Sequence, residues 1–170
     1  VKKFENSLNK FTGSNTCIGV NSGTAALNLA LSLFNLKNKE VLIPSLTFVS
    51  TAHAVILNGA KPIFVDVNPK TLCLDEKQIQ NSITKNTKAI IPVHFAGFPC
   101  NLTAIRSICK KNNLCLIEDA AHAIGSTFNN KKIGAHGDAV CFSFHPVKNL
   151  AMPTGGAITI NHKNHKKFRK

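Results

Sequence analysis

The amino-acid sequence predicts an α/β protein whose mostly parallel sheet is covered by helices on both faces, in a three-layer αβα arrangement. Short aliphatic and β-branched runs alternate with helical stretches along the chain, a pattern typical of repeated βα units. Of the 170 residues, 44% are hydrophobic, which is enough to fill one core. No internal repeat, low-complexity tract or linker interrupts the alternation. We therefore expect a single domain over residues 1–170.

Seven short apolar runs are expected to form the strands of the sheet. Continuous apolar runs suit parallel strands, because such strands are buried on both faces. Turn-forming residues follow several of these runs, as Asn21 does after the first and Pro44 after the second. In chain order the expected strands are 17–20, 40–43, 62–66, 88–93, 114–118, 139–144 and 157–160.

Four stretches between these runs are expected to be helices. Residues 24–34 and 48–58 are rich in small and aliphatic side chains, which favour helices packed on a sheet. Residues 75–82 begin with Asp75, a good helix N-cap, and residues 103–111 end in two lysines, which suit a helix C-terminus. Ligands of such folds bind at the carboxyl ends of the strands.

Both ends of the chain are expected to be truncated. Val1 begins in the style of a helix interior, without a cap or an initiator methionine. The basic stretch 161–170 reads as the start of a further helix.

Bulk properties exclude several classes of function. The formal charge is +13, but the basic residues are scattered in turns such as 37–39 and 129–132 and in the tail. With no Tyr, no Trp and no nucleic-acid motif, we expect no nucleic-acid partner. No apolar run approaches the roughly 18 residues of a membrane span, and residues 1–6 begin no secretory signal, so we expect a cytoplasmic protein with no membrane partner.

The six cysteines are expected to be small buried thiols. They lie inside or beside apolar segments and form no C-x-x-C pair, so we expect neither a metal site nor redox chemistry. These positions are Cys17, Cys73, Cys100, Cys109, Cys115 and Cys141.

Three segments carry residue types that together make a pyridoxal phosphate site. Lys148 follows a strand-like apolar run, where a partly desolvated amine can attack an aldehyde and later carry a proton. Asp119 ends another apolar run, where a carboxylate can keep a pyridine nitrogen protonated. The turn Ser22-Gly23-Thr24-Ala25 opens a helix, and a helix N-terminus favours a phosphate.

Each of these features also has an ordinary structural interpretation. A Ser-Gly-Thr turn is commonly a plain helix cap, and Asp119 suits a helix cap or a surface charge. His122, Ser143 and Phe48 would, taken singly, be structural residues. Their joint arrangement favours the cofactor site, with His122 near the ring, Ser143 on the phosphate and Phe48 stacked on the ring.

At these motifs the chain resembles the sugar aminotransferases of the DegT/DnrJ/EryC1/StrS family, which are fold-type I pyridoxal phosphate enzymes. The similarity runs nearly from end to end, with the blocks in the family's order. The matching blocks are 22–27, 44–48, 59–66, 87–94, 117–122, 142–149 and 155–157.

The resemblance implies a role for each candidate residue. Lys148 would carry the cofactor, and Asp119 would pair with its pyridine nitrogen. His122 would lie beside the ring hydroxyl, and Phe48 would stack on the ring. The phosphate would be held by Gly23, Thr24, Ala25 and Ser143. A lysine at 148 argues against the family's dehydratase branch, which has histidine there.

The resemblance also implies partners and missing parts. The substrate would be a nucleotide-linked keto sugar, aminated at C4 with glutamate as donor, in surface polysaccharide or glycan biosynthesis. The family's proteins are homodimers about twice this length, so the chain would be the large domain, without the C-terminal small domain, and inactive alone. The strand 157–160 would run antiparallel to its neighbours.

Two other functions were weighed. A non-catalytic regulator of the same family would bind the cofactor or a sugar nucleotide, but the joint presence of Lys148, Asp119 and Ser143 disfavours it. A nucleotide-binding α/β protein would need a phosphate motif such as G-x-G-x-x-G or G-x-x-x-x-G-K-[ST], and neither occurs.

Overall fold

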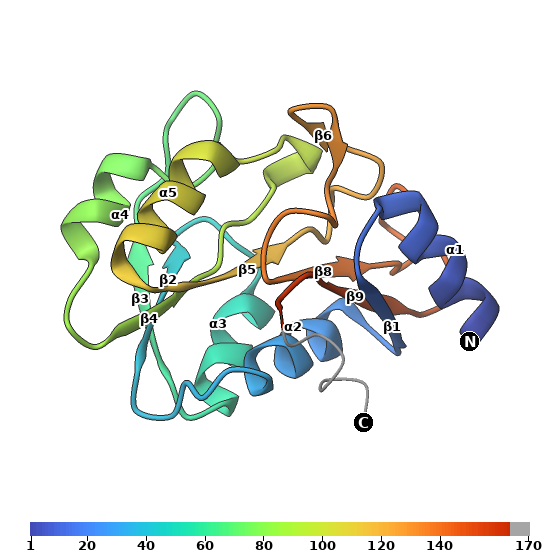
Figure 1. Ribbon diagram of the computed structural model, residues 1–170, viewed down its shortest axis with the longest axis horizontal. Helices are drawn as coiled ribbons and strands as arrows, with labels where there is room; N and C mark the ends of the chain where they lie inside the picture. The colour runs from blue at the N-terminus through green and yellow to red at the C-terminus, as the bar shows by residue number, and fades with distance from the viewer. Residues whose placement is uncertain (164–170) are drawn as a thin grey trace.

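The computed structural model describes residues 1–163 and has the three layers that the sequence predicts, with a seven-stranded sheet at the centre (Figure 1). The strand order is β1-β9-β8-β5-β4-β2-β3. The strands are β1 (Thr16–Val20), β2 (Glu40–Pro44), β3 (Lys61–Val65), β4 (Thr87–Ile90), β5 (Cys115–Asp119), β8 (Ala139–Ser143) and β9 (Gly156–Ile160).

The sheet is parallel except at β9. That strand pairs antiparallel with β1 on one side and β8 on the other, whereas β2–β3, β2–β4, β4–β5 and β5–β8 are parallel pairs. The expectation of one antiparallel strand in this sheet is therefore confirmed. A separate antiparallel ribbon is formed by β6 (Thr127–Phe128) and β7 (Lys131–Lys132).

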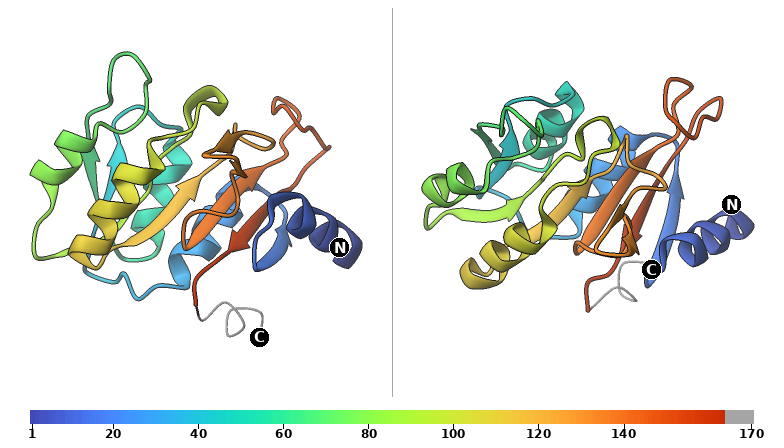
Figure 2. Two further views of the ribbon diagram at one scale, coloured as in Figure 1. Left: turned by 45° about the horizontal axis from the view of Figure 1, so that its top comes forward. Right: turned by 90° about the horizontal axis from the view of Figure 1, so that it is seen from above.

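Helices cover both faces of the sheet (Figure 2). On one face lie α2 (Gly23–Ser32) and α3 (Val49–Leu57), which pack against each other. On the other lie α4 (Glu76–Ser82) and α5 (Leu102–Asn112), while α1 (Lys2–Thr12) packs beside β1.

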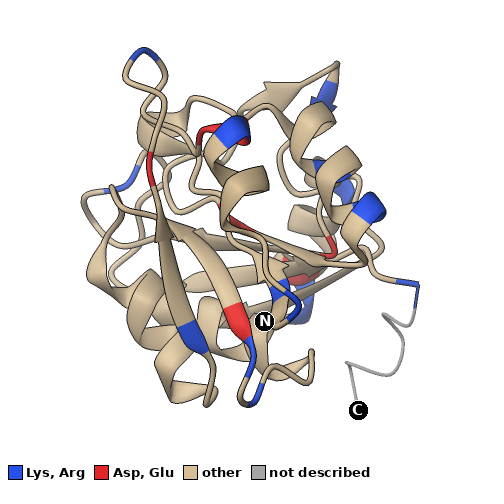
Figure 3. Cartoon of the chain, turned by 90° about the vertical axis from the view of Figure 1, so that its left-hand side faces the viewer, with Lys and Arg blue, Asp and Glu red and all other residues tan. Residues whose placement is uncertain are grey.

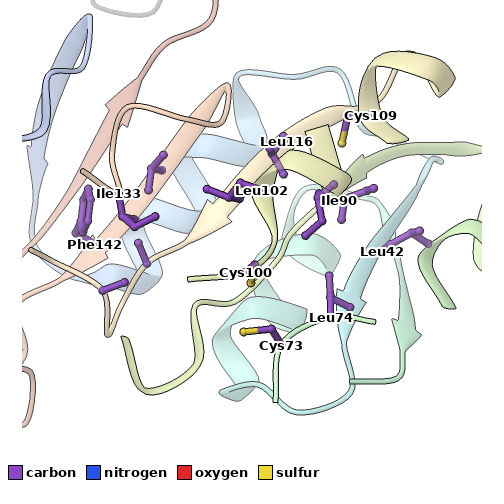
Figure 4. Close-up of a cluster of buried hydrophobic side chains, with 14 of the residues drawn as sticks. Leu42, Cys73, Leu74, Ile90, Cys100, Leu102, Cys109, Leu116, Ile133 and Phe142 are labelled. Carbon is purple, nitrogen blue, oxygen red and sulfur yellow. The ribbon is translucent and has the colours of Figure 1, made fainter. Parts of the chain in front are cut away.

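The period-two alternation of the strands divides the core between these two faces. In β2, Val41 and Ile43 pack into the α2–α3 layer, and Leu42 between them packs into the layer of α4 and α5. In β8, Cys141 and Phe142 divide in the same way. Figure 4 shows the α4–α5 layer, with Leu42 and Phe142 at opposite ends of one continuous cluster.

Most expected elements form within one or two residues of their predicted ends. The largest shift is in the strand expected at 88–93, which ends as β4 at Ile90. Pro92 has no N–H to give to a neighbouring strand, and Val93 makes only an isolated bridge to Asp119.

Besides the 3₁₀ turn Phe95–Gly97, two regular elements were absent from the predicted set. The first is α1, whose narrow apolar stripe of Phe4, Leu8 and Phe11 is interrupted by Lys, Asn and Glu. The second is the β6–β7 ribbon, whose strands are too short to leave a periodic signal. The helix expected in the basic tail falls mainly in residues 164–170, outside the described residues.

The surface agrees with a scattered distribution of basic residues. On the side drawn in Figure 3, Lys and Arg lie on separate loops, helices and strands rather than on one continuous face. All six cysteines are free, and five of them are buried, with Cys115 partly exposed. Among residues 1–163, no helix is long and apolar enough to cross a membrane.

Candidate active site

Asp119 is held rigidly at the carboxyl end of β5, and its side chain is only 5% exposed. Its Oδ2 accepts a hydrogen bond from Thr51 Oγ1 at 2.9 Å, and its Oδ1 accepts one from the Ala121 N–H at 3.1 Å. Its own N–H donates to Pro92 O at 2.9 Å, and its carbonyl accepts from the His94 N–H at 3.0 Å. The carboxylate therefore has a fixed position and still has lone pairs for a further donor.

Thr51 is a site residue that the sequence reasoning missed. It lies in α3, is fully buried, and its Oγ1 is 2.7 Å from Thr47 Oγ1 as well as bonded to Asp119. Thr51 therefore connects Asp119 to α3. Phe48, the residue just before this helix, is 75% exposed. The only sequence signal is the hydroxyl pair Ser50-Thr51 in a helix whose other residues, apart from His53, are apolar.

The predicted phosphate turn is the N-terminus of α2. Ser22 caps the helix, its Oγ accepting from the Ala25 N–H at 3.1 Å. As the first two helical residues, Gly23 and Thr24 have N–H groups with no helix carbonyl to bond, and no acidic residue lies in this turn. A Cβ added to Gly23 would lie 2.7 Å from Ser143 Cβ, so the helix start is pressed against the end of β8.

Lys148 lies in the loop between β8 and β9, and this loop is tied to the two segments just described. On one side, Thr154 Oγ1 donates to Asn21 O at 2.8 Å, next to the turn that opens α2. On the other, Asn149 Nδ2 donates to Ile124 O at 2.9 Å, in the segment that follows Asp119. The half-buried Lys148 is therefore placed between the phosphate turn and the segment after β5.

The electrostatics of His122 relate it to both charged residues. Partial desolvation by the surrounding protein is the main cause that lowers the pKa of His122, although much of the side chain is exposed. The Lys148 ammonium lowers this pKa further, whereas the Asp119 carboxylate opposes the shift. Both charges therefore act on the imidazole of His122. The rings of Phe95 and His122 pack in a T-shaped arrangement, with their centroids 6.5 Å apart.

This cluster is open on one side. Thr24, Phe48 and His122 are exposed, so their polar and aromatic groups face solvent. A cavity of about 360 Å³ lies elsewhere, between the β3–α4 loop, the start of α5 and the β6–β7 ribbon, and none of the predicted site residues lines it.

The residues present fit pyridoxal phosphate. A helix N-terminus with two adjacent hydroxyls, Thr24 and Ser143, suits a dianion. The buried carboxylate of Asp119 still has acceptor positions, which suits a ring cation. The loop that carries the amine of Lys148 is hydrogen-bonded to the segment after Asp119, and the exposed aromatic ring of Phe48 precedes α3. Within residues 1–163, no group of three or more His, Cys, Asp or Glu side chains is arranged to hold a metal ion.

Comparison with known proteins gives consistent matches. Residues 1–169 match the DegT/DnrJ/EryC1/StrS aminotransferase family. The chain is 42% identical over 160 residues to the spore coat polysaccharide biosynthesis protein SpsC of Bacillus subtilis, covering 94% of this chain and 41% of SpsC. The chain thus spans about two fifths of the length of the curated relatives it matches.

Solved structures give the same fold. Spr1654 of Streptococcus pneumoniae, solved in its PLP-form, superposes with a TM-score of 0.94 at 29% identity, covering 99% of this chain and 48% of that one. PseC of Helicobacter pylori, an aminotransferase involved in the biosynthesis of pseudoaminic acid, superposes with a TM-score of 0.92 at 31% identity, covering 99% and 46%.

Proposed function

Because the chain belongs to the DegT/DnrJ/EryC1/StrS aminotransferase family, we propose that its protein is a pyridoxal phosphate-dependent sugar aminotransferase. The observation that carries the proposal is a pair of hydrogen bonds made by the loop that contains Lys148. One joins this loop to Asn21, just before α2, and the other joins it to Ile124, in the segment after Asp119. These hydrogen bonds connect the loop that carries the amine to the N-terminus of α2 and to the segment after the buried carboxylate, which supports the proposal.

Binding is assigned to the start of α2, to Ser143 and to Phe48. The N–H groups of Gly23 and Thr24 and the hydroxyls of Thr24 and Ser143 would hold the phosphate. The N–H of Ala25 would join them only by giving up its bond to the Ser22 cap. Phe48 would cover one face of the ring.

The proton chemistry is assigned to Asp119, Lys148 and His122. When bound, pyridoxal phosphate supplies an aldehyde that captures amines and a ring that draws electrons from the carbon that loses a proton. Asp119, oriented by Thr51, would hold a proton on the ring nitrogen. Lys148 Nζ would hold the cofactor covalently and, once displaced by a substrate amine, move the proton between carbons. His122 would donate to or accept from the ring hydroxyl.

The finer substrate assignment extends this proposal. The amino donor would be glutamate, and the acceptor a keto group at C4 of a nucleotide-activated sugar for surface polysaccharide or glycan synthesis. The relatives SpsC and PseC support a role in polysaccharide or sugar biosynthesis.

The chain is further proposed to be the cofactor-binding large domain of a homodimer. It spans 41% to 48% of its relatives, and residues outside it would complete the sugar pocket. The exposed side chains of Phe48, Val147 and Leu150 would be covered in that assembly.

The proposal is tested on the complete gene product. Pyridoxal phosphate should give it a visible absorption band, and glutamate should bleach that band. Nucleotide keto sugars should then restore it, because the bound amino group leaves with the sugar. A protein that takes up the cofactor but reacts with no donor would be a non-catalytic family member, and the proposed enzyme would be wrong.

A further inference from the structure

A fully buried pair of ionisable side chains lies directly behind Asp119 and has no role in the function proposed above. His94 follows β4 and Glu118 is the residue before Asp119 in β5, and neither side chain is exposed. His94 Nε2 lies 2.8 Å from Glu118 Oε2. Removing ionisable side chains from water costs free energy, which is offset only if their polar atoms are hydrogen-bonded. The presence of this pair at a buried position therefore needs an explanation.

The hydrogen bonds define the proton positions of this pair. The Cys100 N–H donates to His94 Nδ1 at 3.1 Å, so Nδ1 is the acceptor nitrogen and the ring proton lies on Nε2. Nε2–H then donates to Glu118 Oε2, and the Gly137 N–H donates to Glu118 Oε1. Glu118 therefore accepts two hydrogen bonds as a carboxylate. A Cβ on Gly137 would lie 2.7 Å from Oε1, so this contact requires glycine.

These bonds extend to the backbone of Asp119. The His94 N–H donates to the Asp119 carbonyl at 3.0 Å, while the following N–H, of Ala120, donates to Cys141 O at 2.8 Å. Successive strand residues face opposite sides, so Glu118 points away from the Asp119 side chain. The Glu118 carboxylate thus joins the segment after β4 to the segment before β8, and β5 with Asp119 lies between them.

The same pair spans a strained turn that supports His122. Between His94 and Cys100, Ala96 has φ 49° and ψ 26°, the left-handed region that a residue with a side chain rarely adopts. Such a conformation persists only where the surroundings hold it, and the His94–Cys100 bond closes this turn. The turn also carries Phe95, whose ring contacts His122.

We propose that His94 and Glu118 are positioning residues that fix Asp119 and His122 for the reaction. This inference rests on the proposed function, because the position of Asp119 matters only if its carboxylate acts on the cofactor ring. The pair touches no substrate or cofactor itself and acts through the backbone of residues 94–100 and 119–120.

Glu118→Gln in the complete gene product tests this role with little change of shape. If the Gln oxygen accepts from the Gly137 N–H, the Gln NH₂ faces the Nε2–H of His94. If His94 instead carries its proton on Nδ1, that N–H faces the N–H of Cys100, so two donors again oppose each other. We expect cofactor Kd to rise roughly tenfold and kcat to fall about 10- to 100-fold, with KM for the sugar nearly unchanged, since an error of about 1 Å in positioning costs about 100-fold in rate.

Ile105→Val is the matched control for a purely structural effect. Ile105 is fully buried in α5, in the same layer as the pair, and makes no hydrogen bond to it. Both variants are compared well below their unfolding temperatures. The control should lower stability without changing cofactor Kd or kcat.

A double-mutant cycle with Asp119→Asn decides the question. If Glu118 acts through Asp119, its replacement should change kcat little once Asp119 is already neutral. Additive effects, or a Glu118→Gln variant that behaves like Ile105→Val, would overturn the inference. In cofactor-free protein, the NMR signal of the Ala121 N–H, which donates to Asp119 Oδ1, should shift in Glu118→Gln and not in the control. A wild-type protein that binds no pyridoxal phosphate would instead refute the proposed function, while this signal would still test the positioning.

Discussion

Gly23→Ala is expected to weaken phosphate binding at the start of α2. The added Cβ would lie 2.7 Å from Ser143 Cβ and 3.3 Å from Ser143 Cα, whereas ordinary contacts begin at 3.4 Å. The helix start and the end of β8 must therefore separate by about 0.7 Å, because the nearest obstacle is a short side chain next to the backbone. That shift would move the Thr24 and Ser143 hydroxyls apart.

The expected magnitudes follow from this separation. Overpacking of this kind costs about 1 to 3 kcal/mol of stability, partly offset by about 0.5 kcal/mol because alanine loses less chain entropy than glycine. If the phosphate loses about one good hydrogen bond, or about 1.4 kcal/mol, Kd for pyridoxal phosphate rises about tenfold. Gly19→Ala in β1 is the matched control, since its Cβ would meet no atom closer than 3.6 Å.

The assay titrates cofactor-free protein with pyridoxal phosphate and, separately, with pyridoxal, which lacks the phosphate. Gly23→Ala should weaken pyridoxal phosphate about tenfold and leave pyridoxal within about twofold. Equal weakening of both ligands, or of neither, would refute the assignment of the phosphate to this helix end.

Four further outcomes are expected. Lys148→Ala should abolish transamination but still bind the cofactor non-covalently, as spectroscopic titration would show; near-normal turnover would contradict the role of Nζ. Thr51→Val should lower stability by about 1.5 to 3 kcal/mol in denaturant unfolding, because Asp119 loses a buried hydrogen-bond donor. By NMR, His122 should titrate at a lower pH than an ordinary histidine. A nearby cation disfavours the imidazolium, so Lys148→Ala should raise the pKa of His122, and an unchanged pKa would show that Lys148 does not act on it. Expressed alone, residues 1–170 should associate in solution and show little or no activity. A stable monomer with substantial activity would contradict this expectation.

The sequence predicted the fold well because the inner strands β2, β8 and β9 are apolar runs buried on both faces. In β2, for example, Val41 and Leu42 serve opposite layers, so no polar residue interrupts the pattern. The end of β4 was misplaced because the apolar pattern continues through Pro92, although the hydrogen-bonding capacity does not. The amphipathic α1 was missed because its stripe is narrow.

The candidate site was predictable only where a residue type alone carries the chemistry. Asp119 is identifiable because a carboxylate ends an apolar strand, and Lys148 because an amine follows an apolar run, although the structure places it in the loop five residues beyond the end of β8. Thr51 and His94 were not, since their meaning depends on partners 68 and 24 residues away, Asp119 and Glu118. Contacts of this kind are fixed by sheet order, which local patterns do not reveal.

The most direct test of the account is the site of covalent attachment of the cofactor. The complete gene product is loaded with pyridoxal phosphate, reduced with borohydride to make the bond to the amine permanent, and mapped by peptide mass spectrometry. The account predicts one phosphopyridoxyl group per chain, on Lys148, and none in Lys148→Ala. Labelling at another lysine, or equal labelling of the Lys148→Ala variant, would contradict it.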